Sequence, residues 1–264
     1  MSEVAEIIEG NQQDILLLCD HASNAVPGDI ALGIAPELLD RHIAVDIGAG
    51  PLTRSLAARL EAPAILATVS RLVIDLHREP DHVGLIPHRS DGHWIPGNDQ
   101  VDRAGRIARF HAPYHRLLAR RIRAQRPRLI LSIHSFTPRL EHGGTPRPWQ
   151  VGILYNRDTR AARPAIDWLR AQGLETGDNE PYSGRLLNAT LNRHAEANGI
   201  PSIAIEVRND LIGDSGGVEH WAGTLAELAR HLRNVIPAKA GISIDESGGG
   251  SHAIPAFAGM TNSL

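Results

Sequence analysis

Short apolar runs recur along the chain and predict the strands of a buried sheet. They cover residues 15–19, 64–69, 72–76, 128–134, 151–155 and 200–207. Runs of this length without polar alternation are typical of strands that are buried on both faces. Between them, apolar residues at helical spacing predict helices over residues 36–41, 52–60, 102–125, 161–172, 187–197 and 218–235. Strands that alternate with helices predict a single α/β domain, whose mostly parallel or mixed sheet carries helices on both faces.

Three segments lack this periodicity and predict irregular structure. Residues 1–13 form a polar lead-in, and residues 141–148 a loop rich in glycine and proline. Residues 79–100 are rich in histidine, proline, glycine and aspartate. Because structureless stretches of that length in a compact domain are usually functional or disordered, we expect a long loop over a functional site.

The end of the chain has a different composition. The heptapeptide at residues 236–242 nearly recurs at residues 254–260, with three consecutive glycines between the two copies. Two copies are too few for a solenoid, and the glycine, proline and serine content is typical of disorder. We therefore expect a folded domain over residues 1–236 and a disordered low-complexity tail over residues 237–264.

The composition fits one globular domain and excludes several classes of protein. The 264 residues are 42% hydrophobic and carry a formal net charge of −3, with basic and acidic residues interspersed, so we expect no nucleic-acid partner. The first residues contain neither a basic region nor a long apolar segment, which predicts no signal peptide and no membrane span. The lone cysteine, Cys19, excludes an internal disulfide, predicts a cytoplasmic protein and lies in an apolar strand as inert packing. Fourteen histidines are unusually many and justify a search for a metal site.

Polar residues follow three of the apolar runs at their carboxyl ends. His21 follows the first run, His134 ends the fourth, and Glu206 lies near the end of the last. The carboxyl ends of parallel strands are where open α/β sheets place their ligands. A lone histidine at such a point is more often a core residue bonded to a backbone carbonyl. Two histidines and a glutamate at three strand ends instead predict one site with a metal ion and a base.

A hydrolytic zinc site needs three protein ligands and an open position for water. His21 and His134 are the first two candidates, and either Asp46 or Asn24 could be the third. A carboxylate binds a hard dication better than an amide does, which favours Asp46. Asp46 could instead cap the helix that follows it.

A second pair of histidines also has metal-ligand spacing. His111 and His115 lie four residues apart on a predicted helix, with Pro113 between them as a predicted kink. The pair lacks the glutamate that follows the first histidine in zincins. Two histidines at a helix interface are commoner than a metal site, so this pair has two interpretations.

Charged residues beside the candidate ligands suggest the remaining chemistry. Glu206 would act as the general base and take a proton from a water whose pKa the metal has lowered. The alternative is a buried ion pair between Glu206 and Arg208, although residues two apart in a strand can also face one cleft together. Arg71 and Arg78 bracket the run at residues 72–76. One could stabilise an oxyanion and the other could clamp a substrate carboxylate, whereas an ordinary surface position is the usual alternative.

Several segments resemble known hydrolases. Ser132–Phe136 resembles the motif that carries the last zinc histidine of the zinc carboxypeptidases, and Ile205–Asp210 resembles the segment with their catalytic glutamate. Ser70–Arg78, together with Asp20–Asn24 and Asn179–Gly184, resembles the N-formylglutamate amidohydrolase family more closely. That family is similar in fold to those carboxypeptidases, so the resemblance implies a zinc-carboxypeptidase-like sheet. It extends over nearly the whole predicted domain.

The resemblance implies a role for each candidate. Carried over position by position, it makes His21 and His134 metal ligands, Glu206 the catalytic base, Arg71 the arginine that polarises the carbonyl, and Arg78 and His77 the pair that binds the substrate carboxylate. Asp46 is the favoured third ligand, and the further candidate substrate-binding residues are Asn209, Arg208 and Tyr182. Two departures from the families matter. The carboxypeptidases place a glutamate ligand three residues after the first histidine, where this chain has Asn24, and Asp46 lies where an insertion would have moved that ligand. Members of the amidohydrolase family commonly have asparagine at the position of His77.

The resemblance therefore implies a zinc-dependent amidohydrolase with one Zn²⁺ ion and a small-molecule substrate. It would remove a short acyl group, such as formyl, from an acidic amino acid, as in N-formyl-L-glutamate. A metallopeptidase that acts on a peptide or a cell-wall amide is the second interpretation. A non-catalytic binding protein that keeps the cleft is the third. The oligomeric state stays open.

Overall fold

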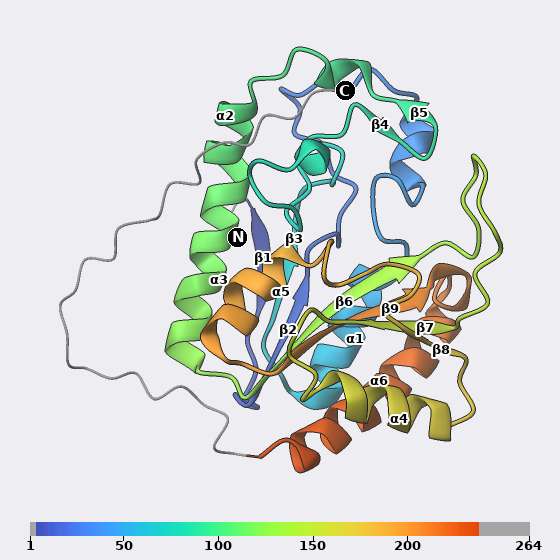
Figure 1. Cartoon of the computed structure of the whole chain (residues 1–264). Helices are drawn as coiled ribbons and strands as arrows, with labels where there is room; N and C mark the ends of the chain where they lie inside the picture. Colours follow the sequence, from blue (N-terminus) through green and yellow to red (C-terminus); the bar gives the residue numbers. More distant parts are fainter. Residues whose placement is uncertain (1–3, 238–264) are drawn as a thin grey trace, which may run out of the picture.

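A mixed sheet of seven strands runs through the computed structural model, which describes residues 4–237 (Figure 1). In spatial order the strands are β1 (Ala5–Ile8), β3 (Ala64–Ala67), β2 (Ile15–Cys19), β6 (Leu129–Phe136), β9 (Ser202–Arg208), β7 (Val151–Leu154) and β8 (Thr176–Asp178). The central strands β3, β2, β6 and β9 are parallel, whereas β1 and β7 run antiparallel to β3 and β9. The predicted α/β class and mixed sheet are confirmed.

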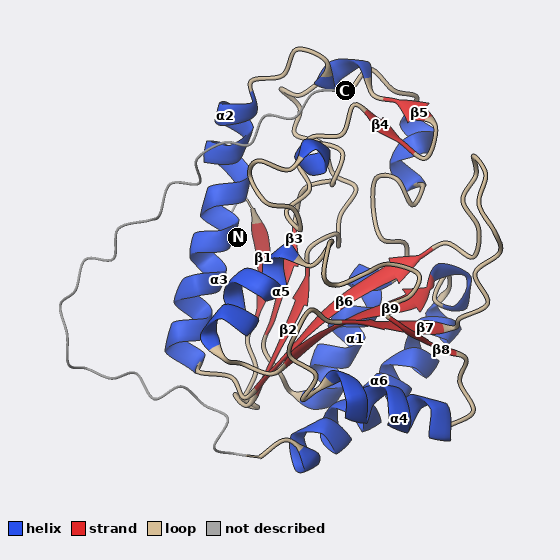
Figure 2. Ribbon diagram, in the orientation of Figure 1, coloured by secondary structure: helices blue, strands red, loops and turns tan. Residues whose placement is uncertain are grey.

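Helices cover both faces of this sheet (Figure 2). One face carries α1 (Ala49–Leu60), α4 (Ala162–Ala171) and α6 (Ser215–Val235), and the other carries α3 (Ala112–Gln125) and α5 (Ala189–His194). The short helix α2 (Arg103–Arg106) leads into α3 through the π-helical segment η4 (Ile107–His111). The remaining elements are a hairpin of β4 (Arg89–Ser90) and β5 (His93–Trp94), and the 3₁₀ turns η1 (Pro36–Asp40), η2 (Val83–Leu85), η3 (Pro96–Asn98), η5 (Glu196–Asn198) and η6 (Asn209–Leu211).

Alternation along the central strands divides the core into two layers and determines where the polar residues point. In β6, Leu131 and Ile133 pack in the layer of α1, α4 and α6, whereas Ile130 packs in the layer of α3 and α5. His134 follows Ile133 in the strand, so it faces the same side as Ile130. Glu206 in β9 lies opposite His134 in the parallel register and shares that face.

Cys19 lies at the end of β2 and is completely buried. Burial raises the pKa of its thiol, so the reactive thiolate is disfavoured. Its side chain packs in the layer of α1, α4 and α6. The structure agrees with the prediction that Cys19 is inert packing.

Three short segments differ from the predicted secondary structure. Residues 72–76 form turns in place of the predicted strand. Side chains satisfy their carbonyl groups, because Asn98 Nδ2 donates to Leu72 at 2.9 Å and Arg106 donates to Val73 at 2.8 Å. These partners come from a later segment, so an apolar run alone cannot distinguish buried turns from a buried strand. The predicted polar lead-in contains β1, which is an edge strand, and β8 at the other edge was not predicted either.

The helix predicted over residues 102–125 changes its geometry just before Pro113. The N–H of Ala112 bonds to the carbonyl of Ile107, five residues earlier, which is π-helical spacing. Proline has no N–H and cannot continue the α-helical ladder, so the wider turn accommodates it. The predicted kink is therefore a π-helical insertion between α2 and α3.

The structure describes the predicted long loop but almost none of the predicted tail. The loop predicted over residues 79–100 contains η2, the β4–β5 hairpin and η3, and none of its residues lines the cavity described below. The tail predicted over residues 237–264 lies outside the described residues except for Pro237, so the domain boundary stays a prediction. Within residues 4–237, no helix has both the length and the apolar character that crossing a membrane requires.

Candidate metal and catalytic site

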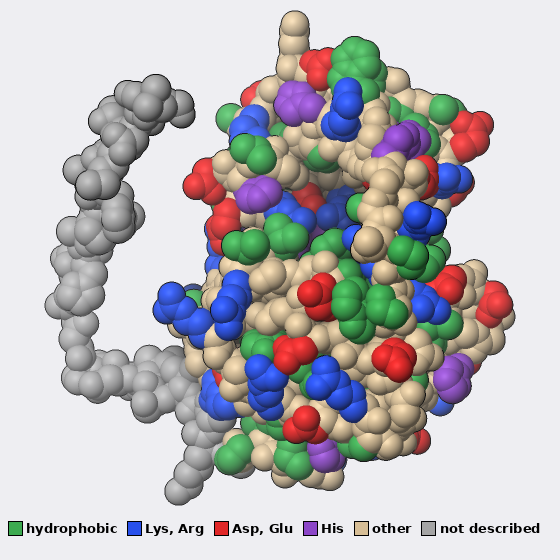
Figure 3. Space-filling model, turned by 45° about the vertical axis from the view of Figure 1, so that its right-hand side comes forward, with side chains coloured by type: hydrophobic (Ala, Val, Ile, Leu, Met, Phe, Trp, Pro, Cys, Tyr) green, Lys and Arg blue, Asp and Glu red, His purple; other side chains and the backbone are tan. Residues whose placement is uncertain are grey.

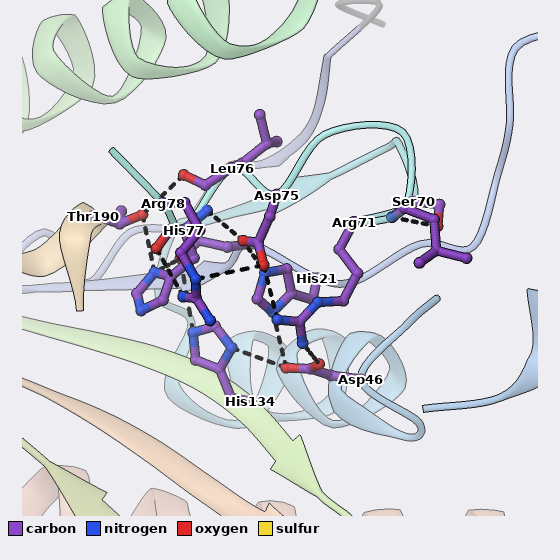
Figure 4. Close-up of polar contacts among 12 residues, drawn as sticks. His21, Asp46, Ser70, Arg71, Asp75, Leu76, His77, Arg78, His134 and Thr190 are labelled. Atoms are coloured by element: carbon purple, nitrogen blue, oxygen red, sulfur yellow. Dashed lines mark hydrogen bonds and ion pairs between the residues drawn. The ribbon is translucent and has the colours of Figure 1, made fainter. Parts of the chain in front are cut away.

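His21, Asp46 and His134 meet at the carboxyl ends of β2 and β6 (Figure 4). Asp46 Oδ2 lies 3.2 Å from His21 Nδ1 and 2.9 Å from His134 Nδ1. All three side chains are almost completely buried, and their three donor atoms lie within 4.8 Å of one another. Two imidazole nitrogens and one carboxylate oxygen form a donor set that zinc commonly uses. The residues therefore fit a single metal ion.

The start of α1 leaves the Asp46 side chain free to join this group. The helix begins after Gly48, and no side chain caps its amino terminus. Gly48 has a φ of +79°, and a Cβ there would lie 2.3 Å from the carbonyl oxygen of Ile212, so the turn requires glycine. The N–H of Asp46 also donates to the carbonyl of His21 at 3.1 Å, which fixes these two residues relative to each other.

Asn24, the other residue considered as a third ligand, lies elsewhere. Its Nδ2 donates to Asp40 Oδ1 at 2.8 Å. Asn24 does not line the cavity that contains His21 and His134. The geometry favours Asp46 over Asn24.

Hydrogen bonds on the far side of each imidazole orient the Nδ1 atoms toward Asp46. His21 Nε2 donates to Asp75 Oδ1 at 2.8 Å, and His134 Nε2 lies 2.9 Å from the Ser132 hydroxyl. A proton held on Nε2 leaves the Nδ1 lone pair available to a metal ion. In protein zinc sites, a ligating histidine typically donates its other ring N–H to a carboxylate in the same way as His21 does to Asp75.

The charges in this group are strongly coupled. Burial and the Arg71 guanidinium disfavour protonation of His21, but Asp75 and Asp46 outweigh them and raise its pKa to about 9. Burial likewise opposes ionisation of Asp46, but His21 and His134 hold the pKa of this carboxyl well below its usual range. The Asp46 and Asp75 carboxylates therefore favour a positive charge at this group of residues. Either a proton or a metal dication can supply that charge.

Glu206 lies next to the three candidate ligands and has an unsatisfied oxygen. Its Oε2 is buried without a hydrogen-bond partner among the described residues, and its side chain lines the same cavity. Burial raises the pKa of Glu206 to about 7. A carboxylate with a pKa near neutrality suits proton transfer in both directions.

These residues form the wall of a cavity of about 130 Å³. The space-filling view shows a hollow in this face, with arginine side chains visible inside it (Figure 3). Besides the four residues above, its lining includes Arg71, His77, Arg78, His42, Phe136, Thr137, Tyr182 and Leu187. The cavity combines two arginines, several imidazoles and an apolar side, which suits a small anionic ligand.

The two arginines have different surroundings. Arg71 donates to Asp46 Oδ1 at 3.0 Å and to Asp75 Oδ2 at 2.8 Å, so its guanidinium bridges the two carboxylates (Figure 4). Arg78 donates to the carbonyl of His77 at 3.1 Å and lies 4.0 Å from Asp75. Arg71 therefore holds the two carboxylates in place, whereas Arg78 makes no hydrogen bond to a carboxylate among the described residues and is the better placed of the two to bind one from a ligand.

Two of the predicted substrate-binding residues lie outside the cavity. The Arg208 guanidinium donates to Asp210 Oδ1 at 2.8 Å and to the carbonyls of Pro148 and Trp149. Asn209 begins η6 and is likewise absent from the cavity wall. Arg208 is the last residue of β9, and its guanidinium is held by Asp210 and by carbonyls of the loop before β7, so it does not reach the cavity beside Glu206.

Tyr182 does line the cavity, and a distant arginine supports it. Arg147 donates to the Tyr182 hydroxyl at 3.1 Å, and its Cζ lies 4.9 Å from the centre of the ring. Arg147 belongs to the predicted Gly/Pro loop between β6 and β7. This loop therefore shapes one wall of the cavity.

His77 lines the cavity but is bonded on one side to Asp20. Its Nδ1 donates to Asp20 Oδ2 at 2.8 Å, and burial lowers its pKa to about 4. Asp20, His77 and His134 are also close enough to form a second set of metal ligands. Tyr114 already donates to the other Asp20 oxygen at 2.7 Å, and His134 Nε2 is 3.7 Å away. The set with Asp46 fits an ion better, because Asp46 Oδ2 lies against both imidazoles.

His111 and His115 make interfacial contacts with the backbone. His111 Nε2 donates to the carbonyl of Arg78 at 2.9 Å, and His115 Nε2 donates to that of Leu76 at 3.0 Å. His115 Nδ1 lies 2.8 Å from His194 Nε2. Of the two interpretations from the sequence, the structure supports the interface.

Sequence reasoning missed the residues that support the candidate ligands. No role is predicted for Asp75 or Asp20 from the sequence, although both lie in segments that carry the family resemblance. Each carboxylate bonds an imidazole more than 50 residues away in the chain, at separations of 54 for His21–Asp75 and 57 for His77–Asp20. The only available signal was that each aspartate lies one or two residues from a candidate histidine.

The mixed α/β sheet places candidate metal ligands and a buried carboxyl group around one cavity, an arrangement that suits metal-assisted hydrolysis. The sequence model of the N-formylglutamate amidohydrolase family matches residues 13–213. The chain belongs to this family, and the predicted resemblance is confirmed. Membership makes it an amidohydrolase of a family named for a glutamate derivative.

Solved structures agree with this fold. A gene product of Agrobacterium tumefaciens is 30% identical, with a TM-score of 0.81, and the match covers 88% of this chain and 96% of that one. An N-formylglutamate amidohydrolase from Ralstonia eutropha is 19% identical, with a TM-score of 0.66, over 89% of this chain and 98% of that one. Curated protein sequences contain no significant match.

Proposed function

We propose that the chain is a zinc-dependent amidohydrolase that removes a short N-acyl group from an acidic amino acid, with N-formyl-L-glutamate as the leading substrate. The observation that carries this proposal is the group of His21, Asp46 and His134 beside the unpartnered Glu206 oxygen. Family membership supports the reaction class. The small cavity favours an N-acyl amino acid over a peptide.

His21 Nδ1, Asp46 Oδ2 and His134 Nδ1 would hold the zinc ion. When bound, zinc would polarise the scissile carbonyl and make a water molecule more acidic. Asp75 and Ser132 keep the two imidazoles in the orientation that this requires. Arg71 bridges Asp46 and Asp75, so it stabilises the ligand set and adds positive charge where the carbonyl oxygen becomes negative.

Glu206 would move the proton. It takes a proton from the attacking water as the oxygen adds to the carbonyl carbon, and it then gives that proton to the leaving nitrogen as the C–N bond breaks. The products from N-formyl-L-glutamate are formate and glutamate. A pKa near neutrality lets one carboxyl group perform both steps.

Arg78 would bind a carboxylate of the substrate. It lines the cavity and has donors that no protein carboxylate occupies closely. A planar guanidinium can hold a carboxylate through two parallel hydrogen bonds. His77, on the same wall, is neutral and could contact the substrate through its Nε2 edge.

Formate release from N-formyl-L-glutamate by the zinc-loaded protein tests this proposal. We expect Glu206→Gln to retain zinc and to lose about 10²- to 10⁴-fold in kcat, the usual contribution of a general acid–base. A peptide panel assayed for free amino acids separates the metallopeptidase alternative. Ligand binding that is insensitive to chelator, without any turnover, would support the non-catalytic alternative. Near wild-type turnover by Glu206→Gln would remove Glu206 from the mechanism.

A further inference from the structure

A second cluster of metal-ligating side chains lies outside the cavity. His93 in β5 meets Glu141 and His142, which belong to the loop between β6 and β7. His93 Nε2 lies 3.0 Å from Glu141 Oε2, and the rings of His93 and His142 are 5.2 Å apart. One donor atom from each of the three residues lies within 4.8 Å of the others.

The Asp91 carboxylate holds the backbone of Glu141 and His142 in place. Asp91, at the turn of the β4–β5 hairpin, accepts the N–H of Glu141 at 2.7 Å and that of His142 at 3.1 Å. Gly92 has a φ of +82°, and a Cβ there would lie 2.3 Å from Cγ of His142. The His142 ring therefore packs directly on the glycine backbone, and these contacts dock the loop on the hairpin.

We propose that His93, Glu141 and His142 form a second metal site, which binds a borderline divalent ion such as Zn²⁺ and fastens this loop to the hairpin. Two imidazoles and a carboxylate favour zinc over calcium or magnesium, which prefer oxygen ligands. Partial exposure of the cluster leaves water to complete the coordination. Arg41 pairs with Glu141 Oε1 at 2.8 Å, so Oε2 is the oxygen that faces His93.

The site would act on the cavity through two contacts. His42 lines the cavity, and its Nε2 lies 2.9 Å from Asp91 Oδ2, the same residue that holds the loop. At the other end of the loop, Arg147 donates to the hydroxyl of Tyr182 on the cavity wall. An ion at the cluster would therefore restrain the two segments that contact His42 and Tyr182 on the cavity wall. It does not depend on the catalytic zinc proposed above.

Zinc stoichiometry tests the second site. Full-length protein is stripped with a chelator, titrated with zinc chloride and assayed for bound zinc by elemental analysis after gel filtration. We expect the double variant His93→Ala/His142→Ala to bind one zinc ion fewer per chain than the wild type. His88→Ala, which removes an exposed histidine of the same segment, is the matched control and should bind as many ions as the wild type.

The catalytic site is measured separately with His21→Ala/His134→Ala. If the second site exists, this variant still binds zinc, and that binding disappears when His93→Ala and His142→Ala are added. Equal stoichiometry in the wild type and His93→Ala/His142→Ala would overturn the second site and leave the catalytic proposal intact. Equal losses in His93→Ala/His142→Ala and His88→Ala would show adventitious surface binding and would also overturn it.

Limited trypsin digestion of the wild type and of a single variant tests the second site independently of zinc stoichiometry. The bond after Arg139 lies in the loop, and Arg139 is exposed. Zinc at ten times its dissociation constant should slow cleavage there about tenfold in the wild type, because cleavage requires the loop to open and release the ion. The single variant His142→Ala should lose this protection. Protection of equal size in the wild type and His142→Ala would contradict the proposal.

Discussion

At the scale of single residues, Asp75 supports the candidate site without being a candidate ligand itself. Its carboxylate accepts from His21, Arg71 and the N–H of His77. Burial opposes its ionisation, but His21, Arg71 and Arg78 hold its pKa well below the usual range. This one carboxylate therefore fixes a candidate ligand and both arginines, although it would not touch the metal itself.

We expect Asp75→Asn to weaken zinc binding about 10- to 100-fold, the usual effect of removing a carboxylate behind a ligating histidine. The amide keeps the shape but loses the charge that orients His21. Competition against a chromogenic chelator measures the affinity. Asp99→Asn, at an exposed aspartate that also bonds a histidine, is the control. Unchanged affinity in Asp75→Asn would show that His21 is not a ligand.

Arg78 and Arg208 offer a second test at the same scale. Arg78→Met should raise KM for N-formyl-L-glutamate about 10- to 100-fold, because a charge-assisted bond to a carboxylate contributes about 1.5–3 kcal/mol. Arg208→Met should leave KM unchanged, since its guanidinium is bonded to Asp210 and loop carbonyls outside the cavity. Steady-state kinetics on both variants decides whether sequence spacing or the observed placement identifies the substrate arginine. A larger effect at Arg208 would reverse this assignment.

At the scale of elements, α3 and α5 support the turn that carries His77 and Arg78. The Leu76 carbonyl can only accept, so His115 Nε2 must carry a proton there. A neutral His115 then accepts at Nδ1, and His194 Nε2 must donate to it. Burial lowers the pKa of His115 to about 2 and that of His194 to about 4. An added proton on Nδ1 of His115 would place two N–H groups against each other.

This pair predicts an acid-sensitive fold. In the unfolded chain both histidines take up protons below their ordinary pKa of 6.5, whereas in the folded chain they do not, so stability is present above pH 6.5 and is lost as the pH falls. Each histidine should cost about 2 kcal/mol between about pH 7 and about pH 5. Urea unfolding at both pH values measures it. His115→Met/His194→Met should flatten the dependence, and His220→Met, at an exposed site, should not. A double variant with the wild-type slope would refute this assignment.

The predicted and observed elements differ in how much of their structure local sequence determines. The strands β2, β6 and β9 were predictable because each contains a mostly apolar run that leads into polar residues, and this pattern also singled out His21, His134 and Glu206. Residues 72–76 are equally apolar but form turns, because their backbone partners come from Asn98 and Arg106. Pairings of that kind depend on the folded path of the chain, so no local pattern contains them.

At the scale of the whole molecule, strand order creates the site. β2, β6 and β9 are adjacent and parallel, so three segments that are far apart in the chain place their carboxyl ends together. Asp46 reaches the same point from the turn before α1. An ion held by these residues would join the amino-terminal half of the sheet to its centre. Metal binding and global stability should therefore be linked.

We expect removal of zinc to lower the melting temperature by about 5–10 °C relative to protein with zinc at about 100 times its dissociation constant. Binding at that excess contributes about 2.7 kcal/mol, and a domain of this size shifts by about 2–4 °C per kcal/mol. Differential scanning fluorimetry with and without chelator measures the shift. The triple variant His93→Ala/His134→Ala/His142→Ala should have the same melting temperature with and without chelator. A persistent zinc effect in that triple variant would place the stabilising ion elsewhere.

The burial of Cys19 has a practical consequence for following the loop between β6 and β7. Because the chain's sole native thiol is inaccessible and disfavours its thiolate, maleimide dyes should ignore it. A cysteine introduced at an exposed position such as Thr145 could then be labelled alone, without first engineering a cysteine-free background. A fluorophore at this position would report in real time whether zinc or substrate reduces the mobility of the loop.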